Sequence, residues 1–171
     1  MAHRLDPSRS RIAVRTEAIG LFSAVAHDLE IEARELRGEA NLDGDDANGW
    51  IECPVRALHV VGAVKRGRVE SNVLSAGDIA DIEKRVRREV LSIEWVRVEA
   101  DAKRVTVHGP RAKQTAGWRG DRRDENGAVV FAGEIALSLA ALGIPEVKGP
   151  LGAFKIADTV RVIYRVAFVA A

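Results

Sequence analysis

The stretch Gly20-Leu21-Phe22-Ser23-Ala24-Val25-Ala26-His27-Asp28-Leu29 separates two segments in which apolar and polar residues alternate. Before it, Ile12 and Val14 alternate with arginine and alanine, which is typical of a half-buried strand. After it, residues 29–34 alternate in the same way. The stretch itself is mostly apolar, whereas exposed loops are usually polar. We therefore expect it to turn inward and to plug one end of whatever the strands enclose.

Alternation with a period of two returns in later segments, which predicts an all-β protein. The longest pattern, residues 160–168, has an almost uniform apolar face and suits a strand that closes a barrel against the first strand. We also expect strands over residues 50–55 and 128–139, a charged loop over residues 120–127, and a buried apolar segment over residues 140–154. Residues 92–98 alternate without showing which face is buried. Because closure removes exposed strand edges, we expect an antiparallel barrel of about eight strands.

One amphipathic α-helix is expected near the middle of the chain. Ser75 and Asp78 have the spacing of a capping box, which marks the beginning of a helix. The apolar residues that follow recur at helical spacing and are Ile79, Ile82, Val86 and Val90. We expect the helix to lie on the barrel with this stripe facing inward.

Length and composition exclude several classes of protein. A chain of 171 residues is expected to form a single domain over residues 1–171. Its net charge of +1 gives no general attraction to nucleic acid. Charged residues interrupt the first dozen positions, and no apolar run is long enough to span a bilayer, so we expect a cytoplasmic protein without stable membrane insertion, unless a leader has been removed. Cys53 alternates with apolar neighbours, which favours an inert buried thiol.

Catalytic and metal-binding patterns are not found in the sequence. The four histidines have no metal-binding spacing, the glycines form no phosphate loop, and no serine lies in a nucleophile elbow. We therefore expect no enzyme activity, no cofactor and no metal site. His27 next to Asp28 is the best candidate for an unusual site, since an imidazole at an apolar rim can bind a ligand headgroup. The alternative is that His27 bonds backbone groups while Asp28 caps the turn.

Two groups of short runs, one near each end of the chain, form a further pattern. The N-terminal runs are Leu5-Asp6-Pro7-Ser8-Arg9-Ser10-Arg11-Ile12-Ala13-Val14-Arg15-Thr16, Gly20-Leu21-Phe22-Ser23 and Ala26-His27-Asp28-Leu29. The C-terminal runs are Leu137-Ser138-Leu139, Leu142-Gly143-Ile144-Pro145, Gly152, Ile156-Ala157-Asp158 and Val160-Arg161-Val162. In place and order these runs resemble the YceI-like family, and the resemblance spans nearly the whole chain.

This resemblance implies a lipocalin-like barrel with an apolar interior that holds a polyisoprenoid or another amphiphilic lipid for storage or transport. It also implies that the chain can form a homodimer. We expect His27 near the mouth of the barrel and a wall that includes Phe22, Leu29, Ile31, Trp95, Trp118, Phe131 and Phe154. The alternative is a filled barrel that serves as a structural or protein-interaction module without a small ligand, because valine, leucine and isoleucine can pack densely.

Overall fold

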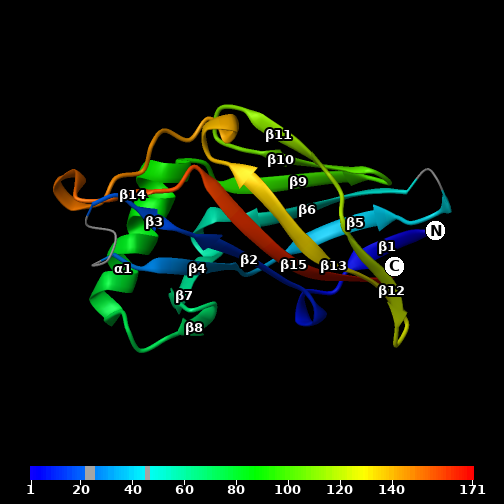
Figure 1. Cartoon of the computed structure of the whole chain (residues 1–171). Helices are drawn as coiled ribbons and strands as arrows, with labels where there is room; N and C mark the ends of the chain where they lie inside the picture. The colour runs from blue at the N-terminus through cyan, green and yellow to red at the C-terminus, as the bar shows by residue number, and fades with distance from the viewer. Residues whose placement is uncertain (22–25, 45–46) are drawn as a thin grey trace.

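The structure, a computed structural model, describes residues 1–21, 26–44 and 47–171 (Figure 1). Within these ranges thirteen strands form one antiparallel sheet, and two short strands form a separate ribbon. The strands of the large sheet are β1 (Ala2–Leu5), β2 (Arg11–Thr16), β4 (Asp28–Ala33), β5 (Arg37–Asn41), β6 (Asn48–Pro54), β7 (Leu58–Lys65), β8 (Arg68–Glu70), β9 (Trp95–Asp101), β10 (Arg104–His108), β11 (Lys113–Gly117), β12 (Gly120–Glu125), β13 (Ala128–Ser138) and β15 (Thr159–Ala170). The ribbon pairs β3 (Ala18–Ile19) with β14 (Lys155–Ile156), and the helix is α1 (Ala76–Arg85).

Many of these short strands are halves of longer, kinked ones. The consecutive strands β1 and β2 both pair with β15, and the pairs β4 with β5, β6 with β7, and β11 with β12 are likewise joined by short kinks. Together with β9, β10, β13 and β15 they make eight long strands, with β8 as a short hairpin arm on β7. This arrangement confirms the predicted barrel of about eight strands.

The sheet curls until it returns to its first strand. β15 pairs with β1 and β2 on one edge and with the whole of β13 on the other. β13 pairs with β12, and β11, which precedes β12, pairs with β10. The prediction of a charged loop over residues 120–127 is therefore wrong for residues 120–125. Main-chain pairing with β13 forms this strand whatever the polarity of its side chains.

The helix fills a gap in the barrel wall. β6 pairs with β9 along its length, whereas β7 turns away to pair with β8, so β7 and β9 diverge (Figure 1). α1 and the π-helical turn Val86–Leu91 lie across this gap. A Glu83 carboxylate oxygen accepts from the backbone N–H of Val60 at 3.0 Å, which ties the helix to the free edge of β7. The predicted capping box of Ser75 and Asp78 is confirmed.

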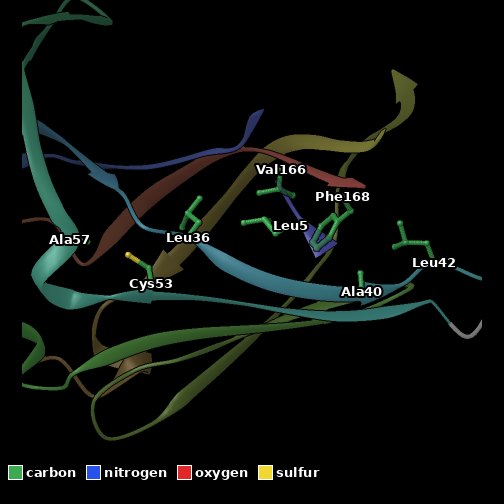
Figure 2. Packing of buried hydrophobic residues seen from close by; sticks show 8 residues of the cluster. All are labelled: Leu5, Leu36, Ala40, Leu42, Cys53, Ala57, Val166 and Phe168. Atoms are coloured by element: carbon green, nitrogen blue, oxygen red, sulfur yellow. The ribbon is translucent and has the colours of Figure 1, made fainter. Parts of the chain in front are cut away.

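Buried apolar side chains form two main clusters along the barrel. One gathers at the end that carries the chain termini and includes Leu5, Leu36, Cys53, Val166 and Phe168 (Figure 2). The other lies toward the helix and includes Ile135, Leu142, Ile144 and Val160. The inner face predicted for the last strand is confirmed, since Val160, Val162, Tyr164, Val166 and Phe168 all face the interior.

The loops at the helix end differ from expectation. The first loop was expected to plug the barrel, but Leu21 is 96% exposed, and residues 22–25 lie outside the described residues. The apolar segment 140–154 was expected to be buried. Leu142 and Ile144 are buried, whereas Leu151 is fully exposed in the left-handed backbone conformation with φ 54°.

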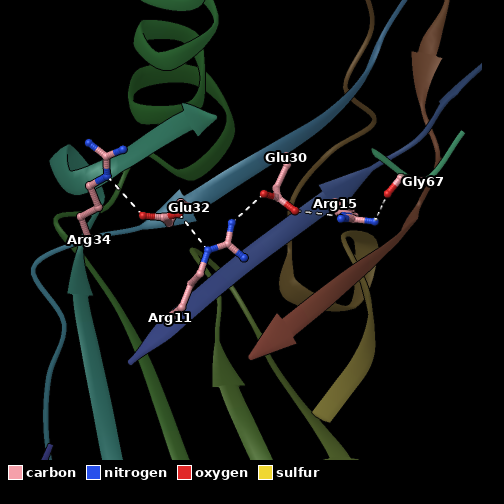
Figure 3. A network of polar contacts seen from close by, with 6 residues as sticks. All are labelled: Arg11, Arg15, Glu30, Glu32, Arg34 and Gly67. Carbon is pink, nitrogen blue, oxygen red and sulfur yellow. Dashed lines mark hydrogen bonds and ion pairs between the residues drawn. The ribbon is translucent and has the colours of Figure 1, made fainter. Parts of the chain in front are cut away.

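A buried carboxylate organises the outer face of β2 and β4. Glu30 accepts from Arg11 Nη2 at 2.6 Å and from Arg15 Nε at 3.0 Å (Figure 3). Arg15 also donates to the carbonyl of Gly67 in the β7–β8 turn. Glu32 extends the network by pairing with Arg11 on β2. These contacts fix the β7–β8 hairpin against the barrel wall.

Candidate ligand cavity

The barrel encloses a cavity of about 980 Å³ that is lined by the inner faces of its strands and by the helix. This volume lies at the upper end of the range of roughly 300–1,000 Å³ that is usual for ligand pockets. The wall is built mainly from aliphatic side chains, of which Val14, Leu29, Ile31, Val98, Val107 and Val162 are examples.

The cavity is elongated along the barrel. On β15 its wall runs from Val160 to Phe168, which is about 26 Å along a strand at about 3.3 Å per residue. The interior stays hollow because short side chains such as Ala33, Ala40 and Ala100 occupy inward positions where bulky ones would meet across it. A long, narrow, apolar space suits an extended hydrocarbon chain better than a flat or compact ligand.

The helix contributes an apolar stripe that faces this space. Ile82, Val86 and Val90 of the predicted stripe line the cavity, as does Leu91. No residue of α1 or of the turn after it is fully buried. Ile82 and Val86 therefore face the open lumen, whereas Val90 and Leu91 also pack against the buried cluster on the helix side.

The cavity opens at two ends, which we name by their surroundings. The helix mouth is bordered by Ala26 and His27, by Val73 and Leu74 before α1, and by residues 148–150. The strand mouth is bordered by Gly44 and Ala47 of the β5–β6 turn, by Asp101 and Ala102 of the β9–β10 turn, and by Arg122 of β12. Exposed residues border the lumen at both mouths, so the lumen is open to solvent there.

The structure places six of the eight predicted site residues on the lining of the cavity. Those that line the cavity are His27, Leu29, Ile31, Trp118, Phe131 and Phe154. Phe22 lies outside the described residues. His27 borders the helix mouth.

Trp95 is placed differently, and its prediction as a wall residue is wrong. Its side chain lies on the outer surface, 39% exposed, with the Arg37 guanidinium 4.2 Å from the ring centroid. Val96 and Val98 take the inward positions of this strand. The alternation of β9 was equivocal because both of its faces carry apolar residues.

Aromatic rings cluster on one wall of the cavity. Trp118 and Phe131 meet edge to face with their centroids 5.7 Å apart, and Phe131 and Phe168 do so at 6.2 Å. Tyr164 lines the same wall and donates its hydroxyl to the carbonyl oxygen of Arg119 at 3.3 Å. Burial raises the pKa of Tyr164, so the phenol is neutral at physiological pH.

The His27 and Asp28 side chains have separate roles. Asp28 accepts from the backbone N–H of Ala18 at 2.8 Å and so fixes the start of the β3–β14 ribbon. His27 lies at the mouth, close enough to Asp78 to act on its charge. Hydrogen bonds from Ser75 are the largest cause that lowers the pKa of Asp78, and His27 adds to them.

Cys53 is buried in the cluster near the chain termini. Burial, with a smaller effect of Glu35, raises the pKa of its thiol to about 11, so almost no reactive thiolate is present at neutral pH. The prediction of an inert buried thiol is thus supported by its surroundings. Across residues 1–21, 26–44 and 47–171, no group of three or more histidine, cysteine or acidic side chains is arranged to hold a metal ion.

Sequence reasoning missed the charged groups at the rims. Asp78 and Asp81 line the cavity from α1, and Arg122 lines it from β12. The pairing register of β12 with β13 is what identifies Arg122 as a lining residue. Arg122 lies directly opposite Phe131, and residues directly opposite each other share a face of the sheet, so both face the cavity. The polarity of residues 120–127 predicts a loop, and a loop has no register with a neighbouring strand.

Comparison with known proteins identifies the fold. No family model matches the sequence, and no curated protein matches it. The crystal structure of Burkholderia cenocepacia BcnA does match, with a TM-score of 0.67 over 95% of this chain and 98% of that chain. The fold is that of BcnA.

This likeness confirms the predicted lipocalin-like barrel with a single helix. The two sequences are 9% identical, so the likeness concerns the fold alone. No described helix combines the length and the apolar character that a bilayer span requires.

Proposed function

We propose that this protein binds one apolar or amphiphilic chain, such as an isoprenoid or another lipid, inside the barrel and stores or transports it without chemical change. The observation that carries the proposal is the apolar cavity of about 980 Å³ that opens to solvent at both ends. Membership of the YceI-like family, a single domain, a cytoplasmic location and homodimerisation belong to the same proposal. The family assignment and homodimerisation rest on the sequence resemblance, and the fold shared with BcnA supports the family assignment. The single domain rests on the chain length, and the cytoplasmic location rests on the pattern of charged and apolar residues.

The affinity would come from removing hydrocarbon from water, at about 0.8 kcal/mol for each methylene group. Association and the ordering of a flexible chain cost several kcal/mol, so short chains should bind weakly. Each added methylene should then raise the affinity about fourfold until the chain fills the cavity. Binding would also stabilise the helix, because its inward apolar stripe packs against the bound hydrocarbon chain.

A filled barrel that acts only as a structural or interaction module is the competing function. It requires the protein's own side chains to occupy the lumen. The open space around Val14, Ile31 and Val162 favours the binding function.

The proposal is tested by titrating the delipidated protein with straight-chain and prenyl alcohols of increasing length. Displacement of an apolar fluorescent dye from the barrel reports binding of each alcohol. We expect affinity to rise with chain length and then level off. Val162→Trp, which places a large ring in the lumen, should abolish uptake. Its matched control is Ile163→Trp on the other face of β15, which should leave uptake intact.

Folding of both variants is checked by thermal melting, because only folded protein reports on the cavity. Affinity without any dependence on chain length contradicts the proposal. So does full uptake by a folded Val162→Trp protein.

A further inference from the structure

Arg122 differs from every other charged residue that lines the cavity within the described part of the chain. The others lie on α1, in loops, or at the last position of β9, whereas Arg122 lies within a strand. It faces Phe131 across the β12–β13 ladder, and its guanidinium carbon lies 5.9 Å from the Phe131 ring centroid. The ring holds the cation at the edge of the apolar lumen.

This guanidinium has no anionic partner among the residues that the structure describes. Its neighbours Asp121 and Arg123 pair with each other at 2.8 Å. Asp124, two positions along the strand, makes no ion pair with it. The side chain is exposed, so its five N–H donors are hydrated and free to bind an acceptor that a ligand supplies.

The other charge at the strand mouth is already occupied. The carboxylate of Asp101 accepts from the backbone N–H groups of Lys103 and Arg104, each at 2.8 Å. It also pairs with the Arg104 side chain at 3.4 Å. Asp101 thus holds the β9–β10 turn, and the unpaired charge at this mouth is positive.

The helix mouth has the opposite character. Its cations Arg85 and Lys148 pair with Glu89 at 3.1 Å and Glu146 at 3.6 Å, respectively. Asp81 lines the cavity there and makes no ion pair with a described residue. A negatively charged headgroup is therefore disfavoured at the helix mouth and favoured at the strand mouth.

We infer that the ligand is an anionic amphiphile whose carboxylate or phosphate binds Arg122 at the strand mouth, while its tail extends past Phe131 and Trp118 toward α1. This inference rests on the proposed function. It adds the headgroup's charge, its binding residue and the direction in which the chain lies. A guanidinium binds either group through two parallel N–H donors, which makes the contact both strong and directional.

The test compares Arg122→Gln with Arg123→Gln, its neighbour on the opposite face of the same strand. Each variant is titrated with a fatty acid, with the alcohol of the same chain length, and with a prenyl phosphate beside its prenyl alcohol. For the wild type we expect at least one anion to bind about tenfold more tightly than its alcohol. Arg122→Gln should remove that preference and leave the alcohols unchanged, and Arg123→Gln should behave as the wild type.

The two anions separate the two headgroup sources. A preference for the fatty acid that is lost in Arg122→Gln identifies a carboxylate, and one for the prenyl phosphate identifies a phosphate. Equal affinities of acid and alcohol in both pairs overturn the inference while the proposed function stands. An anion preference that persists in Arg122→Gln also overturns it. If no chain binds at all, the proposed function itself fails.

Discussion

Removal of the Glu30 carboxylate should destabilise the barrel more than removal of any exposed carboxylate of a simple ion pair. The Glu30 side chain is 4% exposed and lies between Arg11 and Arg15, whose side chains are 46% and 24% exposed. Glu30→Ala deletes both charge-assisted hydrogen bonds. Because the arginines can regain water, we expect a loss of about 2–3 kcal/mol, below the usual 3–5 kcal/mol for a fully buried pair.

For a domain of this size, that loss lowers the melting temperature by about 4–12 °C. Thermal unfolding followed by circular dichroism measures it. The matched control is Glu134→Ala, whose carboxylate pairs with Arg161 at 3.2 Å with both side chains about half exposed. Exposed pairs contribute little, so this variant should melt close to the wild type. Equal melting temperatures for the two variants contradict the argument.

The effect should also depend on pH. Burial alone would raise the pKa of Glu30, but hydrogen bonds from Arg11 and Arg15 outweigh burial and lower it below its ordinary value of 4.5. The stability that Glu30 contributes is therefore fully present above pH 4.5 and is lost as the pH falls through the lowered pKa. The difference in the free energy of unfolding between wild type and Glu30→Ala should narrow over that acidic range. A constant difference at all pH values contradicts this linkage.

Three further predictions concern the interior. Cys53, with a pKa of about 11, should react with a thiol reagent at pH 8 only after unfolding, and rapid reaction of the folded protein argues against its burial. Trp118→Ala should weaken chain binding in the dye assay, whereas Trp95→Ala should not, because only Trp118 lines the cavity. An equal loss of affinity in the two variants contradicts this placement of the rings. Gly133→Ala would place a methyl group 2.7 Å from the Tyr164 hydroxyl oxygen and should lower stability by about 1–3 kcal/mol in chemical denaturation; unchanged stability contradicts the tight packing there.

The sequence predicted the parts of the fold that depend on local periodicity. The last strand alternates so regularly that its inner face could be identified residue by residue, and the Ser75 capping box marked the start of the helix. Leu29 and Ile31 alternate with polar residues in the strand after the first loop, and both line the cavity. These features survive in the sequence because each is set by residues close together in the chain.

Features that depend on pairing between distant segments were missed. β12 consists almost entirely of charged residues and looks like a loop, but its backbone pairs with β13 and closes the barrel. Trp95 lies in a strand with apolar residues on both faces, so only its partners β6 and β10 decide which face is inside. Arg122 was missed as a lining residue for the same reason, because its inward position follows from the register with Phe131.

The most direct measurement of the central claim is native mass spectrometry of the protein after incubation with long-chain alcohols and fatty acids. The account predicts a single bound chain per barrel, retained by the wild type and by Ile163→Trp but not by Val162→Trp. If the wild type keeps the mass of the free protein with every chain offered, the lumen does not hold a ligand and the account is contradicted.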